Sequence, residues 1–488
     1  MREDWIDAQL GDVLYLKNGF AFKSSEYNSI GTPVIRISDI NGGIVSPLKS
    51  VFVKESGEFD NYQVENGDIL IAMSGATTGK FGVFEGKEKA YQNQRVGNLK
   101  PFSERLIHKN FIYYLLFSLK RQIEKEAYGG AQPNISGKLI ERLKIQLPPL
   151  SEQRAIVSKI EELFSELDHS ISNLKSAQAK LEIYRQAVLK KAFEGGLTEE
   201  WRERNPMKSS FISLSEISKM RKENKSGKRS IYHKKIDFDF NYSRSAEIPS
   251  WSKGTLDKLI YIAARIGWRG LKKDEYKEVG PFFLSVHSLN HGKYVDFSEA
   301  FHISNERYIE SPEIQLQNGD VLLCKDGAGI GKIAIVKDLQ FAATVNSSLL
   351  IIRGMEVLIQ DFLYYLFSGP SLQKIVFERI TGSATPHLFQ NDIRKFELLI
   401  PPIEEQTQIV QEIESRLSVA DKMAETIRTS LQKAEALRQS ILKKAFEGKL
   451  LTESELEACR KEPDWEPAER LLERIKKEKV LTKNKRNV

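Results

Sequence analysis

The sequence predicts an α+β protein in which two globular, mixed α/β domains are joined by two long helices forming an antiparallel coiled coil. Residues 147–197 and 400–450 align without a gap, and Leu-Lys-Lys-Ala-Phe-Glu-Gly occurs in both, at 189–195 and 442–448. Within both segments apolar residues recur at every seventh position, which is typical of a coiled coil. A repeat period of 253 residues is too long for a solenoid and indicates a duplicated domain with its helix. Two related sites about a pseudo-two-fold axis are therefore expected.

The overall composition is that of a globular protein with several domains. The chain has 488 residues, of which 41% are hydrophobic and 28% charged. It has no apolar run of about 18 residues and no signal peptide at its N-terminus, so we expect a cytoplasmic protein. Its two cysteines, Cys324 and Cys459, make neither a disulfide framework nor a zinc site. The net charge of +7 is compatible with nucleic-acid binding but does not establish it.

The repeat divides the chain into six parts. Positions 201–235 contain eleven Lys and Arg but only three Asp and Glu. This composition is typical of a solvated linker, which could also contact phosphate. The predicted parts are a first domain (1–147), a first helix (148–196), a basic linker (197–250), a second domain (251–400), a second helix (401–449) and a C-terminal helical tail (450–488).

Each domain is expected to combine short strands with one helix. Asn-Gly and Gly-Gly turns separate the strand-like stretches, and a Tyr-Tyr motif with helical apolar spacing follows them. The predicted strands are Thr32–Ile37, Asp68–Met73 and Gly82–Glu85 in the first domain, and Gly319–Leu323, Lys332–Val336 and Asn346–Ile352 in the second. The predicted helices are Phe111–Ser118 and Phe362–Ser368, with packing as their role.

The two long helices are predicted from the Pro-Pro pairs to the final glycines. Ser151 is the N-cap candidate of the first helix, and Gly195 and Gly448 are the expected C-cap residues. About 44 residues at 1.5 Å each give a rod on the order of 65 Å. The chain order favours an antiparallel pair with one domain at each end. The main seam is Ile160, Leu167, Leu174, Leu181, Val188, Ile413, Ala420, Ile427, Ala434 and Ile441, and Ile156, Leu163, Ala177, Tyr184, Ile409, Met423 and Leu437 alternate with it.

Motifs for catalysis are missing. Gly75–Lys80 and Gly327–Lys332 resemble a nucleotide-binding P-loop, but each is one residue short and lacks the Mg²⁺-binding hydroxyl. Strand-like residues follow both, so a glycine-rich β-turn carrying a lysine fits better. No methyltransferase loop, nucleophile triad, carboxylate pair or metal-ligand spacing is present. We therefore expect neither a catalytic site nor a metal nor a cofactor on this chain.

Binding is the remaining function. Polar clusters occur at matching places in the two domains, at 92–95 and 346–348, and again at 129–136 and 382–389. Their side chains are of the types that read base edges, although surface loops are polar anyway. The scaffold is repeated while single residues differ, as expected of a duplicated module that reads two sequences. The predicted DNA contacts are Lys80, Asn93, Gln94, Arg95, Gln132, Asn134, Lys332, Asn346, His387 and Gln390.

The chain resembles the specificity subunit of type I restriction–modification systems over essentially its full length. The resemblance is carried by Pro148–Gln153 and Pro401–Gln406, by the repeated heptapeptide, and by the turns at Asn66–Leu70 and Asn318–Leu322. It implies that each variable domain is a target recognition domain for one half of an asymmetric, bipartite DNA sequence. It implies a non-catalytic chain whose coiled coil sets the gap between the halves and docks two modification subunits, with restriction subunits added.

The same resemblance places the cofactors on the partners: S-adenosylmethionine, ATP and Mg²⁺ are expected there and not on this chain. The residues expected to form the coiled coil or to dock subunits are Ile160, Leu167, Leu174, Leu181, Val188, Phe193, Ile413, Ile427, Leu437, Ile441 and Phe446.

Two other functions stay open from sequence. One is a coiled-coil structural or adaptor protein without sequence-specific DNA binding, for which DNA retention would be insensitive to salt and sequence. The other is a free-standing enzyme with a divergent nucleotide site at Gly327–Lys332, which calorimetric titration with ATP and S-adenosylmethionine would test.

Overall fold

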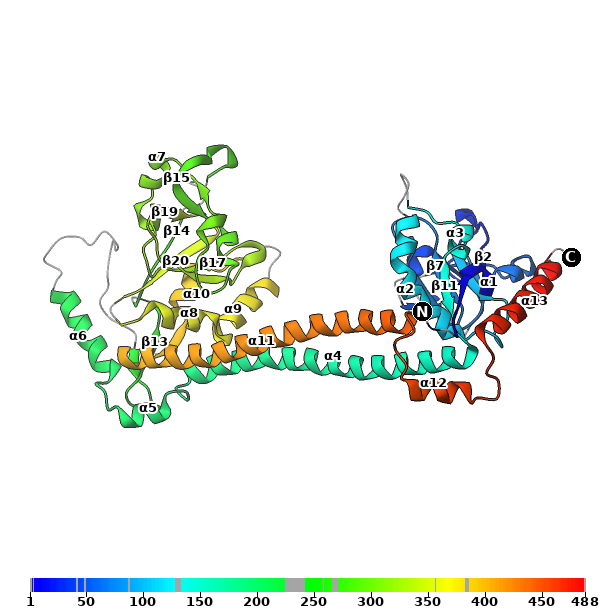
Figure 1. Ribbon diagram of the computed structural model, residues 1–488. Coiled ribbons are helices and arrows are strands. Elements are labelled where there is room, and N and C mark those ends of the chain that lie inside the picture. The colour runs from blue at the N-terminus through cyan, green and yellow to red at the C-terminus, as the bar shows by residue number, and fades with distance from the viewer. Residues whose placement is uncertain are drawn as a thin grey trace. The chain divides into compact units, whose positions relative to one another are not determined.

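The computed structural model in Figure 1 divides into two compact units. Unit 1 comprises Met1–Leu174 with Thr429–Val488, and unit 2 comprises Lys175–Arg428. No helix within the described ranges is long and apolar enough to cross a membrane. The structure describes residues 2, 4–40, 43–47, 50–86, 88–127, 133–223, 242–257, 259–265, 271–355, 357–381 and 386–486.

The described part of unit 1 contains a five-stranded sheet of order β2-β10-β7-β8-β4, a four-stranded sheet of order β5-β3-β9-β6, and the pair β1-β11. Helix α2 packs its apolar face into the core that the larger sheet shares with the long helices. The elements of this domain are β1 (Ile6–Gln9), α1 (Leu10–Val13), β2 (Leu14–Asn18), β3 (Thr32–Ile35), β4 (Gly43–Val45), β5 (Val51–Val53), β6 (Gln63–Val64), β7 (Ile69–Ala72), β8 (Phe81–Phe84), β9 (Ala90–Gln92), β10 (Val96–Pro101), α2 (Lys109–Ala127), α3 (Gly137–Glu141) and β11 (Lys144–Leu147).

Unit 2 repeats this topology. Its sheet order β14-β20-β17-β18 corresponds to β2-β10-β7-β8, and the parallel pair β15–β19 corresponds to β3–β9. The predicted domain duplication is therefore confirmed. Its domain elements are β12 (Tyr242–Arg244), β13 (Ser252–Thr255), β14 (Ile260–Ala264), β15 (Lys277–Leu284), β16 (Phe301–His302), α7 (Asn305–Ile309), β17 (Val321–Cys324), β18 (Ile333–Ile335), β19 (Ala343–Val345), β20 (Leu349–Gly354), α8 (Gln360–Ser368), α9 (Pro370–Thr381), α10 (Gln390–Arg394) and β21 (Glu397–Ile400).

The Asn-Gly-Asp turns that open β7 and β17 are structural. Asp68 and Asp320 are almost fully buried, and each accepts a backbone N–H of its own turn. Asp68 pairs with Lys100 at 2.7 Å, and Arg353 donates to both carboxylate oxygens of Asp320. Burial raises the pKa of the Asp320 carboxyl, and the arginine opposes that shift. An equivalent ion pair, with lysine in unit 1 and arginine in unit 2, thus connects the two central strands of the sheet in each domain.

The long helices are α4 (Leu150–Phe193) and α11 (Ile403–Phe446), each of 44 residues, as predicted. Gly195 and Gly448 have positive φ angles of 80° and 70°, the left-handed conformation of a C-terminal cap, so this prediction is confirmed. The N-cap prediction for Ser151 is wrong: the helix begins at Leu150, directly after the Pro-Pro pair, and Ser151 lies inside it. Proline fixes the backbone ahead of the first turn without needing a side-chain cap.

The main seam is buried nearly as predicted. Nine of its ten residues are buried, and Leu174 is half-buried. The alternating row differs: Tyr184, Met423 and Leu437 are exposed by 43%, 54% and 51%, so Leu437 does not lie in the helix–helix seam. Two helices alone cover only a narrow stripe on each other, and the second row is buried only where a domain packs on it, as at Ile156 and Ile409.

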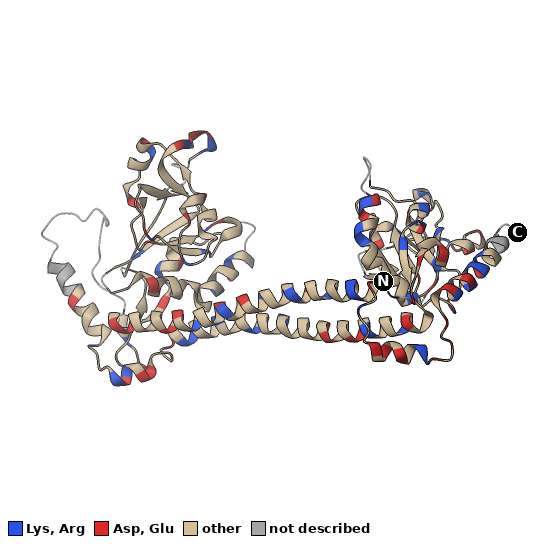
Figure 2. Cartoon of the chain, in the orientation of Figure 1, with Lys and Arg blue, Asp and Glu red and all other residues tan. Residues whose placement is uncertain are grey.

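The two long helices run antiparallel, because the residue number on α11 falls as that on α4 rises from one interhelical ion pair to the other. Arg438 pairs with Asp168 in unit 1, and Arg185 pairs with Asp421 at 2.6 Å in unit 2. Asp421 lies 253 positions after Asp168, and Arg438 lies 253 after Arg185. The two pairs are therefore the same contact made twice, with the roles of the helices exchanged. Figure 2 shows both signs of charge distributed along α4 and α11.

The repeated entry motif fastens each domain to a helix start. Gln153 is fully buried, accepts the N–H of His108 ahead of α2 and donates to the Pro148 carbonyl. Gln406 makes the equivalent bonds with Ile359, ahead of α8, and with Pro401. The preceding acids, Glu152 and Glu405, accept the indole N–H of Trp5 and Trp251 at 2.8 and 2.7 Å.

The heptapeptide fastens each domain to a helix end. Phe446, in the last turn of α11, packs on Phe111 of α2 with ring centroids 5.4 Å apart. Phe193, in the last turn of α4, packs on Phe362 of α8 at 5.2 Å. Each domain is thus held by the start of one long helix and the end of the other.

The predicted linker and tail contain ordered helices. Residues 224–241 lie outside the described range, but the earlier part of 197–250 forms α5 (Glu199–Arg204) and α6 (Ser210–Glu223). Leu214 of α6 is fully buried in the core of unit 2, so this part differs from the predicted solvated linker. The tail is helical as expected, with α12 (Glu453–Arg460) and α13 (Ala468–Arg486) packed on unit 1.

Candidate nucleic-acid interface

Loops from distant parts of the first domain meet where β3, β7 and β9 end. The Asn93 N–H donates to Ile35 at the end of β3, at 3.0 Å. The Met73 N–H donates to the Arg95 carbonyl, and the Ile135 N–H donates to Met73, both at 2.9 Å. This network joins the turn after β9, the turn after β7 and the segment ahead of α3. The first predicted cluster, 92–95, and the described part of the second, 133–136, therefore lie at one edge of the domain.

The second domain builds the same network from different residues. The Asn346 N–H donates to Leu284 at 2.9 Å, the Lys325 N–H to Ser348 at 2.8 Å, and the Leu388 N–H to Lys325 at 2.9 Å. Each of these positions corresponds to one in the first network, and only the two asparagines are identical in side chain. A common backbone scaffold thus presents a different set of side chains in each unit.

The lysine-bearing turns lie at this edge and join antiparallel strands. Gly75 and Gly79 have positive φ angles of 81° and 83°, and Gly327 and Gly331 have 75° and 86°. Strands β8 and β18 follow at once, where a P-loop continues into a helix, and this excludes the P-loop reading at both turns. A lysine follows each turn, exposed in both units.

The side chains at the first edge are mostly exposed. Gln94, Arg95, Asn134 and Lys80 are exposed, whereas Asn93 is half-buried and its carbonyl oxygen accepts the Arg95 N–H at 3.2 Å. No bond of the Asn93 amide nitrogen is present in the described part of the chain. Gln132 lies outside the described residues.

The second edge is more internally bonded. Lys332 is exposed and donates to Asn290 at 2.6 Å, and the Asn346 carbonyl oxygen accepts the Ser348 N–H at 3.0 Å. His387, the counterpart of Asn134, forms a close hydrogen bond with Asp326 through Nδ1. Gln390 is half-buried and begins helix α10.

Two cations at these edges were not predicted. Arg36 directly follows β3, is half-buried, and its Nε has no partner among the described atoms. Lys325 directly follows β17 and pairs with Asp326 at 2.7 Å. Both are the first charged residue after a buried apolar strand, which was the signal available in the sequence.

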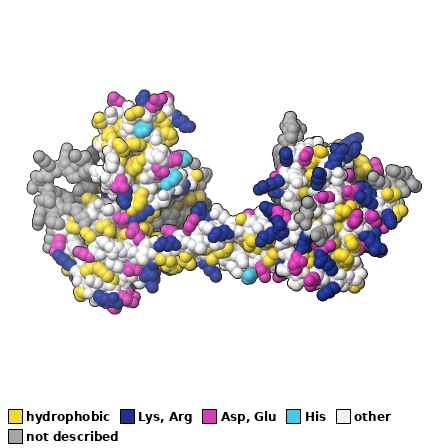
Figure 3. Space-filling model, in the orientation of Figure 1, with side chains coloured by type: hydrophobic (Ala, Val, Ile, Leu, Met, Phe, Trp, Pro, Cys, Tyr) yellow, Lys and Arg dark blue, Asp and Glu magenta, His cyan; other side chains and the backbone are white. Residues whose placement is uncertain are grey.

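The surface chemistry of these edges suits contact with a polyanion. In the face that Figure 3 shows, lysine and arginine side chains gather over unit 1 more densely than over unit 2. Within the described ranges, no group of three or more His, Cys, Asp or Glu residues could hold a metal ion. Basic and amide side chains on loops braced by a rigid sheet are suited to contact phosphates and base edges.

Comparisons with known proteins agree with this arrangement. The family model described as "Type I restriction modification DNA specificity domain" matches residues 2–176 and 267–435. The chain is 27% identical to the type I restriction enzyme EcoBI specificity subunit of Escherichia coli, over 100% of this chain and 94% of that protein. It is 25% identical to the EcoKI specificity subunit of Escherichia coli K12, over 99% and 97% of the two chains.

Solved structures show the same fold. One is from a study of complex assembly and conformational transition of the type I restriction–modification system, with TM-score 0.65 and 18% identity, covering 92% of this chain and 99% of that one. Another is the HsdS subunit from Thermoanaerobacter tengcongensis, with TM-score 0.53 and 18% identity, covering 92% and 98%. Both curated relatives are named as specificity subunits and neither as an adaptor or a free-standing enzyme.

Proposed function

This chain belongs to the type I restriction–modification DNA specificity family and is a sequence-specificity subunit with two recognition repeats, and from this premise we propose how it reads DNA. Each unit reads one half of a split target with the loop edge described above. The observation that carries the proposal is the repeated backbone network, which includes Asn93–Ile35 in unit 1 and Asn346–Leu284 in unit 2. At its other positions this network holds different side chains in the two copies.

The difference between the two edges makes the target asymmetric. Unit 1 offers an amide at Asn134 and a guanidinium at Arg95, whereas unit 2 offers an imidazole at His387 and a hydroxyl at Ser348. Arginine and asparagine bond guanine and adenine edges bidentately, while hydroxyls read either base. The exposed lysines at 80 and 332 supply phosphate contacts that carry affinity but no sequence information.

We assign the gap between the half-sites to the helix pair. Helices α4 and α11 are each continuous over 44 residues and run from one unit into the other. A paired helix holds its length, about 1.5 Å per residue, where a flexible linker would not. Two readers on one face of B-DNA must match the helical phase of about 34 Å per turn.

The chemistry of modification and cleavage belongs to partner chains. The relatives are named as subunits of restriction enzymes, and by that likeness this chain assembles with two modification subunits and with restriction subunits. S-adenosylmethionine, ATP and Mg²⁺ bind to those partners and not to this chain. The supporting observation on this chain is its near-symmetric scaffold, in which the ion pair Asp168–Arg438 recurs as Asp421–Arg185.

The proposal is tested by coexpressing the chain with its modification subunit in a host without DNA methylation and mapping methylated adenines by single-molecule sequencing. One asymmetric split motif, methylated on both strands, is expected. A variant with Asn134→Ala should relax one half of that motif and leave the other unchanged. Equal loss at both halves would contradict the assignment of one half to each unit.

A further inference from the structure

The two units differ at the place where the Tyr-Tyr motif of α2 or α8 meets a long helix. In unit 2 the Lys293 ammonium lies 2.6 Å from Asp361 and 2.5 Å from Glu414. It also lies over the rings of Tyr364 and Tyr365, 5.8 and 5.0 Å from their centroids. Two carboxylates and two aromatic faces around one alkylammonium group form a cation-binding site. In unit 2 this site is filled by a side chain of the unit itself.

Unit 1 has no lysine at the equivalent position. Strand β4 pairs with β8 in parallel, as Tyr294 pairs with β18, and this register makes Gly43 the counterpart of Lys293. A Cβ atom at Gly43 would lie 3.7 Å from the Tyr113 hydroxyl, so this position lies against the Tyr-Tyr motif of α2. The side chain that fills the site in unit 2 is therefore missing from unit 1.

A cavity of about 450 Å³ lies beside the two tyrosines of unit 1. Its walls include Tyr113 and Tyr114 of α2 and Glu161 and Phe164 of α4. The Tyr114 ring lies 5.4 Å from the Tyr113 ring and 5.9 Å from the Phe164 ring. Burial and the Glu161 charge raise the pKa of Tyr114 to about 12, so its hydroxyl is neutral at pH 7. The cavity thus combines aromatic faces with one carboxylate, and its volume suits a small molecule.

Four equivalent positions near the tyrosine pair differ in charge between the units. In unit 2 they hold two bases and two acids, Lys293, Lys337, Asp361 and Glu414. In unit 1 they hold no base and two acids, Gly43, Glu85, Asn110 and Glu161. Burial raises the pKa of Tyr113 and the Glu85 charge raises it further, so Glu85 acts on this tyrosine pair. Within the described ranges neither acid of unit 1 forms an ion pair, and Glu161 only accepts from Asn110, at 3.0 Å.

Arg438 does not supply the missing positive charge. It lines the cavity of unit 1, but it pairs with Asp168. The same contact, Arg185–Asp421, is present in unit 2 together with Lys293, so the arginine does not replace the lysine. Two negative charges at the unit 1 cavity are therefore left without a counterion among the described residues.

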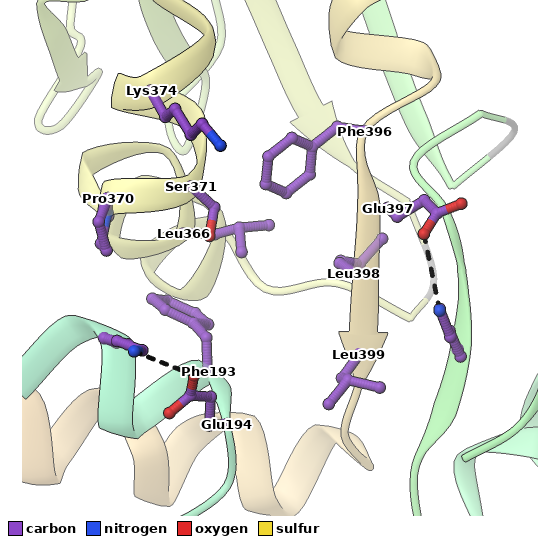
Figure 4. Close-up of a pocket in the computed structure, with 13 residues that line it drawn as sticks. Phe193, Glu194, Leu366, Pro370, Ser371, Lys374, Phe396, Glu397, Leu398 and Leu399 are labelled. Atoms are coloured by element: carbon purple, nitrogen blue, oxygen red, sulfur yellow. Dashed lines mark ion pairs between the residues drawn. The ribbon is translucent and has the colours of Figure 1, made fainter. Parts of the chain in front are cut away.

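The cavity of about 490 Å³ that Figure 4 shows in unit 2 has the opposite charge. Its two carboxylates already pair with lysines, Glu194 with Lys190 at 3.9 Å and Glu397 with Lys253 at 3.7 Å. Lys374 lines it as well and makes the net charge of its lining positive. An ammonium ion is therefore attracted to the unit 1 cavity and not to this one.

We propose that the cavity between α2 and α4 in unit 1 binds a small aliphatic diammonium ion, with one ammonium group at Glu161, as Lys293 lies at Glu414 in unit 2, and the other toward Glu85. The tyrosine rings attract the ammonium groups and cover the alkyl chain. A small molecule is favoured over a protein segment, because a single lysine side chain fills the equivalent place in unit 2. The inference goes beyond the proposed function and does not depend on it.

Isothermal titration of the full chain with 1,4-diaminobutane tests the proposal. One equivalent of the diamine is expected to bind. Butylammonium at the same ionic strength should bind at least about tenfold more weakly, because it leaves one carboxylate without a partner. No binding of the diamine, or equal affinity for the two amines, would overturn the proposal.

Two isosteric variants each remove one of the carboxylates. Glu161→Gln and Glu85→Gln change exposed side chains, so the fold is preserved, and each should weaken diamine binding at least about tenfold. The controls are Glu166→Gln, an exposed acid of α4 outside the cavity, and Glu414→Gln, the counterpart of Glu161 in unit 2. Wild-type affinity in both cavity variants, or an equal loss in the controls, would mean that the diamine binds to negative surface charge in general and would refute the assignment.

Hydrogen exchange with mass spectrometry locates the bound diamine in the full chain. Saturating 1,4-diaminobutane should increase the protection of α2 (Lys109–Ala127) and leave that of α8 (Gln360–Ser368) unchanged. Increased protection of both helices, of α8 alone, or of neither would contradict a site in unit 1.

Discussion

The two buried glutamates that receive tryptophan N–H groups should respond differently to replacement by glutamine. Glu405 is fully buried and both of its oxygens are bonded: Oε1 accepts from Thr198 at 2.8 Å and Arg202 at 2.5 Å, and Oε2 accepts from Trp251 at 2.7 Å. In Glu405→Gln one oxygen becomes an NH₂ group that faces a donor, and Arg202 loses its counterion. We expect unit 2 to lose about 2–4 kcal/mol of stability.

Glu152 offers the contrast within the same molecule. Its Oε2 accepts from Trp5 and lies 3.7 Å from Arg2, while its Oε1 has no partner in the described structure. An amide nitrogen can take the Oε1 position, and glutamine keeps the bond to Trp5. We therefore expect Glu152→Gln to change the stability of unit 1 by less than about 1 kcal/mol at pH 7.

The contrast has a pH dependence with a definite sign. Burial raises the pKa of Glu152, and the Trp5 bond opposes that shift only in part. A carboxyl whose pKa is higher in the folded than in the unfolded state gives its full stabilisation below the unfolded-state pKa. That stabilisation is lost as the pH rises through the folded-state pKa. Because glutamine does not titrate, the stability of unit 1 in Glu152→Gln should rise relative to that of the wild type as the pH increases from 4.5 to 7.

Hydrogen exchange with mass spectrometry measures both variants in the full chain, because peptides from β11 and β21 report on the two units separately. Glu404→Gln, an exposed neighbour, is the control. The reasoning fails if Glu405→Gln lowers protection in unit 2 by less than about 1 kcal/mol, or if Glu152→Gln destabilises unit 1 as strongly.

Three further predictions concern recognition and assembly. Lys80→Ala should weaken DNA binding of the assembled complex for all sequences alike and reduce the slope of log K against log salt by about one, and a changed base preference would argue against a phosphate contact. Asn134→Ala should cost about 1–3 kcal/mol of discrimination in one half-site, read from methylation maps; an unchanged motif would remove Asn134 from the reading set. Leu181→Glu, buried in the seam, should separate the helices and abolish copurification of modification subunits, with a weaker effect for half-buried Leu174→Glu.

The long helices were predictable because their signal is long. A seam at seven-residue spacing runs from 160 to 188 and from 413 to 441, within helices of 44 residues, and a glycine marks the C-terminal end of each helix. Strands of two to four residues, such as β4, β6 and β9, give no comparable signal, because alternation over so few positions does not stand out. The second row of apolar positions was assigned to the seam because the sequence does not show where a domain covers a helix.

The site was predictable as a set of loops and less so as single residues. The described parts of the polar clusters of each domain do meet at one edge, but Gln92, from the first cluster, is fully buried and donates to the Lys17 and Val96 carbonyls. Likewise, the sequence indicates that Gln153 and Gln406 are surface residues at a helix start. In the structure both are buried and hydrogen-bond the start of a long helix to the segment ahead of α2 or α8. A polar residue with internal partners cannot be told from an exposed one by sequence alone.

The central claim is that each unit reads one half of the target, and exchanging a domain tests it most directly. Residues 252–400 would be replaced by residues 6–147, whose boundary strands β1 and β11 pair in the same way as β13 and β21. The docking contacts are equivalent: Phe111 packs on Phe446 as Phe362 packs on Phe193.

The measurement is the methylation map of this variant, coexpressed with the modification subunit. Two copies of one reader on a pseudo-symmetric scaffold should turn the asymmetric target into an inverted repeat of the first half-site. Retention of the original second half-site by a well-assembled complex would contradict the account.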